Sequence, residues 1–216
     1  MIVEYYMTTD LVTIEPETKI YDAVEVMNQH EIHRLPVLKD GKLVGLITEG
    51  TIQSAMPSKA TSLSVYEVNY LLNKTTVAET MIQEVVTIKP TALLEDAIKR
   101  MRENNVGVLP VCDGERLVGI ITNNDIFDAF LEITGYNQEG LRVTIEIAED
   151  HRGVLARLTA LFAENHMNIV QIVVFRHEGQ PTIVVQLTNA EEEKVRNILS
   201  AHDFVVKSVV ETAKED

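Results

Sequence analysis

A threonine and an aspartate three residues apart, Thr122 and Asp125, lie in the segment "GIITNNDI" at residues 119–126. Thr-x-x-Asp ahead of an apolar helix is typical of a capping box, in which the hydroxyl accepts from the backbone N–H of Asp125 and the carboxylate reaches back to the N–H of Thr122. The same helix start can hold a phosphate on its free backbone N–H groups. The carboxylate would then turn toward neutral donors such as ribose hydroxyls. A structural cap and a nucleotide site are both open.

The segment "GLITEGTI" at residues 45–52 repeats this pattern 74 residues earlier, with Thr51 in place of the aspartate. Thr48 can still meet a phosphate, but the hydroxyl of Thr51 lacks the bidentate, charge-assisted hydrogen bonds of a carboxylate. Losing such contacts costs roughly 1.5–3 kcal/mol, or about tenfold or more in affinity. We therefore predict one strong site at the second copy and a weak or vacant site at the first.

The two segments end two copies of a longer unit. Residues 3–52 align with residues 77–126 at the same offset, and the coincident residues include Met7/Met81, Pro16/Pro90, Ala23/Ala97, Pro36/Pro110 and Gly45/Gly119. Each copy predicts a short strand, a helix with apolar residues at i, i+3, i+4 and i+7, two strands joined by a glycine turn, and a last helix. The order β-α-β-β-α thus occurs twice, over residues 1–56 and 77–135.

Residues 57–76 connect the two copies, and residues 136–140 form a turn-rich hinge after the second copy. The connection predicts a helical linker that either packs on the repeats or gates a ligand site. Its apolar face carries Val65, Val68, Leu71 and Leu72. Beyond the hinge, residues 141–212 predict the order β-α-β-β-α-β, the ferredoxin-like split unit. The fold class is therefore mixed α/β and α+β, with three small domains.

The doubled pattern "xLPV…DG.LVGIIT..D" resembles a tandem pair of CBS domains, also called a Bateman module, over residues 1–135. The resemblance implies an adenosine-containing ligand: AMP, ADP, ATP or S-adenosylmethionine. It implies that Thr122 contacts a phosphate, that Asp125 contacts the ribose, and that the base lies near Thr87, Val108 and Pro110.

His33 and Arg34 precede Leu35 and Pro36, at a place where CBS pairs often reach across to the phosphate bound by the other repeat. The alternative for these two residues is a solvated loop. The sequence "HEIH" at residues 30–33 does not predict a zinc site, because its histidines are spaced i and i+3 instead of i and i+4. We therefore expect no metal.

The segment "EDHRGVLARLTALFAENHMNI" resembles the front of an ACT domain, and the match covers residues 141–212. Its matching residues are Asp150, Arg152, Gly153, Asn168 and Ile169, whereas His166 stands where a glycine is usual. The resemblance implies either a small metabolite such as an amino acid bound at these residues or dimerisation; Asp150 and Arg152 can equally be turn and cap residues. The order of the domains and the linker is similar to the acetoin-utilisation AcuB family.

The composition excludes several classes of function. With a formal net charge of −14 and no basic stripe, the chain is not expected to bind nucleic acid or an anionic membrane. No apolar run approaches the roughly 20 residues that span a bilayer, and the first ten residues lack the features of a secretory signal. Cys112 is the only cysteine, in an apolar strand, so we expect a buried thiol and a reducing cytoplasm.

The sequence contains no nucleophile elbow, P-loop or dinucleotide fingerprint, so we expect no catalytic residue and no catalytic cofactor. We predict a cytoplasmic regulatory protein, a homodimer by resemblance, that binds an adenosine ligand and controls an unidentified protein. One alternative is a structural module with vestigial pockets. The other is an amino-acid sensor that acts only through the third domain.

Overall fold

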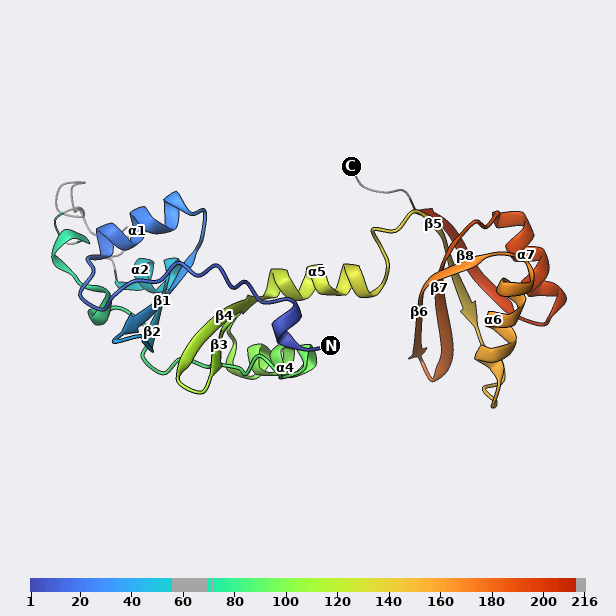
Figure 1. Cartoon of the computed structure of the whole chain (residues 1–216), viewed down its shortest axis with the longest axis horizontal. Coiled ribbons are helices and arrows are strands. Elements are labelled where there is room, and N and C mark those ends of the chain that lie inside the picture. Colours follow the sequence, from blue (N-terminus) through green and yellow to red (C-terminus); the bar gives the residue numbers. More distant parts are fainter. Residues whose placement is uncertain (56–69, 71, 213–216) are drawn as a thin grey trace. The chain divides into compact units, whose positions relative to one another are not determined.

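The computed structural model of the chain describes residues 1–55, 70 and 72–212. It divides into two compact units, Met1–Ile126 and Phe127–Asp216, whose elements are labelled in Figure 1. Most of the predicted linker helix, including Val65, Val68 and Leu71, lies outside the described residues. Its end, at residues 70 and 72–74, is helical, and Leu72 packs against the core of the first repeat.

The two repeats of the first unit contain the same elements in the same order. The first repeat has η1 (Val3–Tyr5), α1 (Ile20–Gln29), β1 (Arg34–Lys39), β2 (Lys42–Thr48) and α2 (Glu49–Ala55); the second has η2 (Val77–Glu79), α4 (Leu94–Asn104), β3 (Val108–Asp113), β4 (Arg116–Thr122) and α5 (Asn123–Ile133). The four strands form one antiparallel sheet in the order β1-β2-β4-β3. The short strands predicted at "LVTI" and "VVTI" are reduced to single parallel bridges, Ile14 with Val37 and Ile88 with Val111.

Both hairpins of this sheet turn on a glycine, as predicted. In the first hairpin, Asp40 and Gly41 both have positive φ (52° and 77°), which is the backbone of the type I′ turn that Asp-Gly favours. In the second hairpin the loop begins at Gly114, with φ of 61°, and the register is kept although the glycine has moved by one residue. Each hairpin therefore ends in the same place, at the threonine directly before the last helix of its repeat.

The leading segment of each repeat packs on the other repeat. The N–H of Val3 donates to the carbonyl of Ala92 (2.9 Å), and the N–H of Val77 donates to the carbonyl of Thr18 (2.8 Å). Each arm then bridges to a strand of the other repeat, Thr8 to Ile120 of β4 and Ile82 to Leu46 of β2.

The same exchange is seen in the side chains. The side chain of Met7 fills the space beside Gly119, and that of Met81 fills the space beside Gly45, so that a Cβ on either glycine would clash with a methionine sulfur. Exchange of these arms joins the two repeats into one unit.

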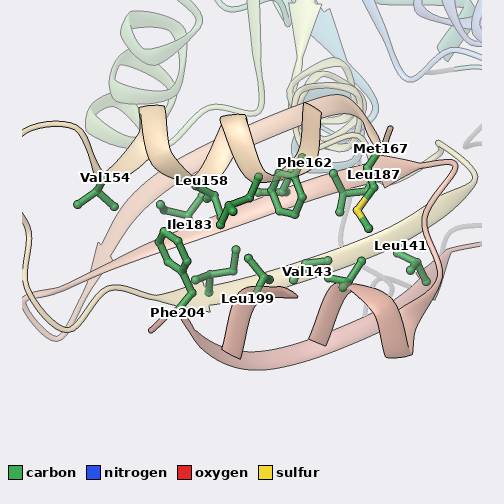
Figure 2. Close-up of a cluster of buried hydrophobic side chains, with 14 of the residues drawn as sticks. Leu141, Val143, Val154, Leu158, Phe162, Met167, Ile183, Leu187, Leu199 and Phe204 are labelled. Atoms are coloured by element: carbon green, nitrogen blue, oxygen red, sulfur yellow. The ribbon is translucent and has the colours of Figure 1, made fainter. Parts of the chain in front are cut away.

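The second unit has the order β5 (Gly140–Glu146), α6 (Val154–Glu164), β6 (Asn168–His177), β7 (Gln180–Thr188), α7 (Glu192–Ala201) and β8 (Val205–Thr212). Its antiparallel sheet runs β6-β7-β5-β8, so the predicted β-α-β-β-α-β order is confirmed. Figure 2 shows its core, where Leu158 and Phe162 of α6 and Leu199 of α7 meet the strand residues Val143 and Ile183. Among the described residues, no helix combines the length and apolar character needed to cross a membrane.

Candidate ligand site

The predicted capping box at the start of α5 is confirmed. The backbone N–H and the hydroxyl of Thr122 both donate to one carboxylate oxygen of Asp125, Oδ2, at 2.6 and 2.8 Å. The N–H of Asp125 donates in return to the Thr122 hydroxyl at 3.4 Å. The other oxygen of Asp125, Oδ1, makes no hydrogen bond within the described part of the chain, and the residue is half-buried. The carboxylate therefore caps the helix with one oxygen and can accept hydrogen bonds from a ligand with the other.

The first repeat forms the same box with a threonine. The hydroxyl of Thr51 accepts from the N–H of Thr48 at 3.0 Å, and the N–H of Thr51 donates to the Thr48 hydroxyl at 3.1 Å. The Thr51 hydroxyl donates its single hydrogen to the carbonyl of Thr48, at 2.8 Å. Both repeats thus cap their helices through the same pair of positions, but only Asp125 keeps an unused acceptor. A threonine is sufficient for the cap, so the cap alone does not require the carboxylate of Asp125.

A cavity of about 320 Å³ lies where the two repeats of the first unit meet, at the start of α5. This volume is at the lower end of the range of roughly 300–1,000 Å³ for small-molecule sites. The first repeat supplies an apolar wall and charged residues, and the second repeat supplies the end of β4 and the first turn of α5. Its lining comprises Thr8, Asp10, Leu11, Val12, Glu31, Ile32, His33, Arg34 and Pro36, together with Gly107, Ile120, Thr122, Asn123 and Asn124.

Arg34 links the two repeats at this cavity. Its guanidinium donates to the carbonyl of Gly107 at 3.1 Å, and the same carbonyl accepts from the N–H of Asn123 at 3.2 Å. The N–H of Asn124 has no acceptor among the described residues, because the first N–H groups of a helix lack an intrahelical partner. The flanking N–H groups of Asn123 and Asp125 donate to Gly107 and Thr122. An anion in the cavity could therefore meet a guanidinium and a helix start together.

His33 lines the same cavity, with its Nδ1 atom 3.0 Å from a carboxylate oxygen of Glu49. The structure thus brings together three of the residues predicted from different repeats: Thr122, His33 and Arg34. Within the described ranges, no group of three histidine, cysteine or acidic side chains is arranged to hold a metal ion.

The remaining predicted residues of the adenosine site do not line this cavity. Asp125 is next to it, because its carboxylate is bonded to the lining residue Thr122. Val108 and Pro110 are buried in β3, opposite Thr122 and Ile120 of β4. Thr87 lies at a different cavity, where its carbonyl accepts from Arg100 at 2.6 Å.

Thr48 is opposite Arg34 in the β1–β2 pair and is engaged in its own box. The apolar wall next to Thr122 is instead made by Leu11, Val12 and Ile32 of the other repeat. These three residues were not predicted, because the motif around Thr122 indicates only contacts within its own repeat. The expected reach of Arg34 to the other repeat was the one sequence feature that pointed across.

A second cavity, of about 460 Å³, lies in the second unit between the start of α6 and β6. Of the residues predicted there, Asp150 and Gly153 line it, whereas Arg152 and Asn168 do not; Asn168 donates to Thr188 at 3.3 Å instead. Gly153 has φ of 96°, a conformation that favours glycine. Arg176, which sequence reasoning missed, pairs with Asp150 at 2.8 Å at the edge of the cavity.

A family model of the CBS domain matches residues 3–58 and 77–132, and a model of the ACT domain matches residues 143–207. The chain belongs to the CBS-domain family. An ACT domain follows its CBS pair, as predicted from the sequence motifs.

One relative of the CBS pair is a CBS domain-containing protein of Dictyostelium discoideum. It is 34% identical over 135 residues, which cover 62% of this chain and 93% of the relative. Among solved structures, a putative acetoin utilization protein (AcuB) from Vibrio cholerae is similar with a TM-score of 0.53 and 26% identity, over 62% of this chain and 93% of that one. The predicted likeness to AcuB is thus found in the fold as well as in the sequence.

Two further structures that resemble the CBS pair were solved with adenosine compounds. The CBS pair of protein MJ0100, in complex with 5′-methylthioadenosine and S-adenosyl-L-methionine, has a TM-score of 0.50 and 28% identity, over 60% of this chain and 95% of that one. CBSX2 in complex with AMP has a TM-score of 0.52 and 29% identity, over 61% of this chain and 97% of that one.

Proposed function

We propose that this chain is a non-catalytic sensor that binds an adenosine-containing ligand, namely AMP, ADP, ATP or S-adenosylmethionine, in its CBS pair. The observation that carries the proposal is the cavity in which Arg34 and an apolar wall of the first repeat face Thr122 and the start of α5. The unused oxygen of Asp125 adds an acceptor next to Thr122.

The cavity offers a separate contact to each of three parts of the ligand. A phosphate or carboxylate would meet the guanidinium of Arg34 and the N–H of Asn124, because a helix start and an arginine both favour anions. The ribose hydroxyls would donate to Asp125. The base would pack against the wall formed by Leu11, Val12 and Ile32. The similar CBS pairs solved with AMP and with S-adenosylmethionine support this class of ligand.

A ligand that contacts both repeats stabilises the arrangement in which it fits both, and so shifts the equilibrium between arrangements of the pair. The helix α5 begins at the cavity with Asn123 and ends at Ile133, after which the chain enters the ACT domain. We propose that this shift alters what the ACT domain presents to an unidentified regulated protein. We also propose a cytoplasmic homodimer, and a role in acetoin utilisation that rests on the likeness to AcuB.

The ACT domain is a second candidate ligand site. Its cavity places the cation of Arg176 against Asp150 at the start of α6. An amino acid could enter there, its amino group toward Asp150 and its carboxylate toward Arg176. The chain would then sense an amino acid through the ACT domain, and mutation of Arg176 instead of Asp125 would abolish the response.

A thermal-shift panel of AMP, ADP, ATP, S-adenosylmethionine, adenosine and the amino acids tests the proposal. A ligand at about 100 times its dissociation constant adds roughly 2.7 kcal/mol to the free energy of unfolding, which corresponds to a rise of about 5–10 °C. We expect a rise with at least one adenosine compound. No rise with any compound in the panel would favour a structural module with vestigial pockets.

The variant Arg34→Met tests the contact with the phosphate separately from the contacts with the rest of the ligand. We expect it to weaken AMP about tenfold, because a hydrogen bond to a charged group is lost, and to leave adenosine nearly unchanged. Methionine keeps the apolar stem of the side chain, so the wall of the cavity is preserved. If AMP and adenosine lose affinity equally in a calorimetric titration, Arg34 supports the cavity and does not contact the phosphate.

A further inference from the structure

A third cavity, of about 610 Å³, lies between α4 and the segment before it, in the second repeat. Three basic side chains line it: Lys89 from the segment, and Lys99 and Arg100 from α4. Thr87 and Thr91 add two hydroxyls. No residue is shared with the adenosine cavity. Three cations around one hollow are unusual in a chain whose net charge is −14.

The cations of this hollow are weakly neutralised by the protein. Arg100 donates one N–H to the carbonyl of Thr87, at 2.6 Å, which fixes the guanidinium at the wall and leaves its other donors available. Lys99 is 3.9 Å from Glu103, too far for a hydrogen bond. Within the described part of the chain, the ammonium group of Lys89 has neither a hydrogen bond nor an ion pair, and only the backbone carbonyl of this residue is engaged, by the N–H of Ala92.

Comparison with the first repeat shows that the fold does not require these cations. At the constant offset of the two repeats, Glu15 stands in place of Lys89, Glu25 in place of Lys99, and Val26 in place of Arg100. Both sets belong to the same elements, a segment before a helix and that helix.

The acidic side chain of Glu25 in the first repeat changes the pKa of a neighbouring tyrosine. There the carboxylate of Glu25 accepts a hydrogen bond from Tyr21 and raises the pKa of that phenol. The sign of charge on this side of the helix is thus reversed between two copies of one structure.

We propose that the hollow formed by Lys89, Lys99 and Arg100 is a binding site for a small polyanion that carries a diphosphate group. Lysine ammonium groups bind phosphate as point charges, and an arginine held at the wall can add a directed pair of hydrogen bonds. The thiol of Cys112, on the same wall, stays protonated because burial raises its pKa, so it adds no negative charge.

All three cations line the hollow, but consecutive residues of a helix point in different directions, so a diphosphate would contact Lys89 together with Lys99 or with Arg100. Asp96 and Glu103 line the same hollow. They repel anions, and with three cations against two carboxylates the lining keeps a net positive charge. A single phosphate would gain less from this arrangement than a diphosphate.

The test is a calorimetric titration of the full chain with inorganic pyrophosphate at low ionic strength, where screening is weak. We expect saturable binding by the wild type and at least about tenfold weaker binding by Lys89→Glu/Lys99→Glu, because each lost cation removes charge-assisted contacts. This variant installs the residues that the first repeat has at the same positions, so it should fold. The matched control, Lys194→Glu/Lys207→Glu in the second unit, changes the net charge equally without touching the lining of the hollow, so it should bind pyrophosphate as the wild type does.

Three results would overturn the proposal. They are no saturable binding of pyrophosphate by the wild type, equal affinity of the wild type and Lys89→Glu/Lys99→Glu, or loss of pyrophosphate binding in Arg34→Met. The last result would assign the anion to the adenosine cavity. If the glutamate variant unfolds at a lower temperature than the wild type, Lys89→Gln/Lys99→Gln replaces it, with the same expected loss. AMP binding by these variants reports on the adenosine site separately, so each site can fail without the other.

Discussion

Asp125→Thr should weaken the binding of an adenosine ligand by at least about tenfold and leave the unfolding temperature close to that of the wild type. The first repeat supplies the reason for both effects. Thr51 makes the cap of α2 with hydrogen bonds of 3.0 and 3.1 Å to Thr48, so a threonine at position 125 can make the same cap for α5. What it cannot supply is the second carboxylate oxygen, which makes no hydrogen bond within the described residues.

Two further variants complete this experiment. Asp125→Ala should lose both the cap and the ligand, with a cost to stability of about 0.5–2 kcal/mol. Thr51→Asp should strengthen any weak site at the first repeat, because it restores the acceptor there. Titration of each variant with AMP and with S-adenosylmethionine, beside a thermal melt, separates the two effects. If Asp125→Thr binds as tightly as the wild type, the carboxylate is a helix cap and nothing more.

Gly140→Ala should destabilise the ACT domain by about 3 kcal/mol or more, the largest effect expected of any glycine-to-alanine change in the chain. Gly140 begins β5 with φ of 142°, a conformation that L side chains rarely adopt. A Cβ there would clash with the carbonyl oxygen of Leu187 in the neighbouring strand β7. Because the obstacle is backbone in the middle of a sheet, it cannot move aside as the end of a side chain would.

Gly179→Ala is the matched control for this prediction. Gly179 also has positive φ, 86°, but no atom lies within 4 Å of a Cβ built on it. It should therefore cost only the backbone term, about 1 kcal/mol. Calorimetric melts of the two variants would measure the difference, and AMP titrations should show that the CBS pair is intact in both. Equal melting temperatures for Gly140→Ala and Gly179→Ala would show that the strands relax around the added methyl group.

The parts of the fold that were predicted are those set by local pattern. The spacing of apolar residues predicted the helices, and the glycines predicted the hairpin turns. The pair Thr122 and Asp125 predicted the cap of α5. The family could be predicted from the repeat, because a single offset of 74 residues aligns the motifs of both copies. Such signals lie within a few residues of one another, so a single sequence contains them in full.

The site could be predicted only in part, because it depends on contacts between distant segments. The arms before each repeat cross to the other repeat, and nothing local to Val3 or Val77 indicates that crossing. The apolar wall of the cavity beside Thr122 includes Leu11 and Val12 of the other repeat. The sequence motifs had placed the base near Thr87, Val108 and Pro110, all in the repeat that carries Thr122. Arg176 was missed for the same reason, since its partner Asp150 is 26 residues away, in the loop between β5 and α6.

The most direct test of the central claim is a calorimetric titration of the wild-type chain with the adenosine compound that gives the largest thermal shift. The unused oxygen of Asp125, against the fully engaged hydroxyl of Thr51, predicts one strong site per chain. A stoichiometry of one, with any second site about tenfold weaker or more, is therefore the expected result. Two equal sites per chain would contradict the role given to Asp125, and no heat of binding with any adenosine compound would contradict the sensor itself.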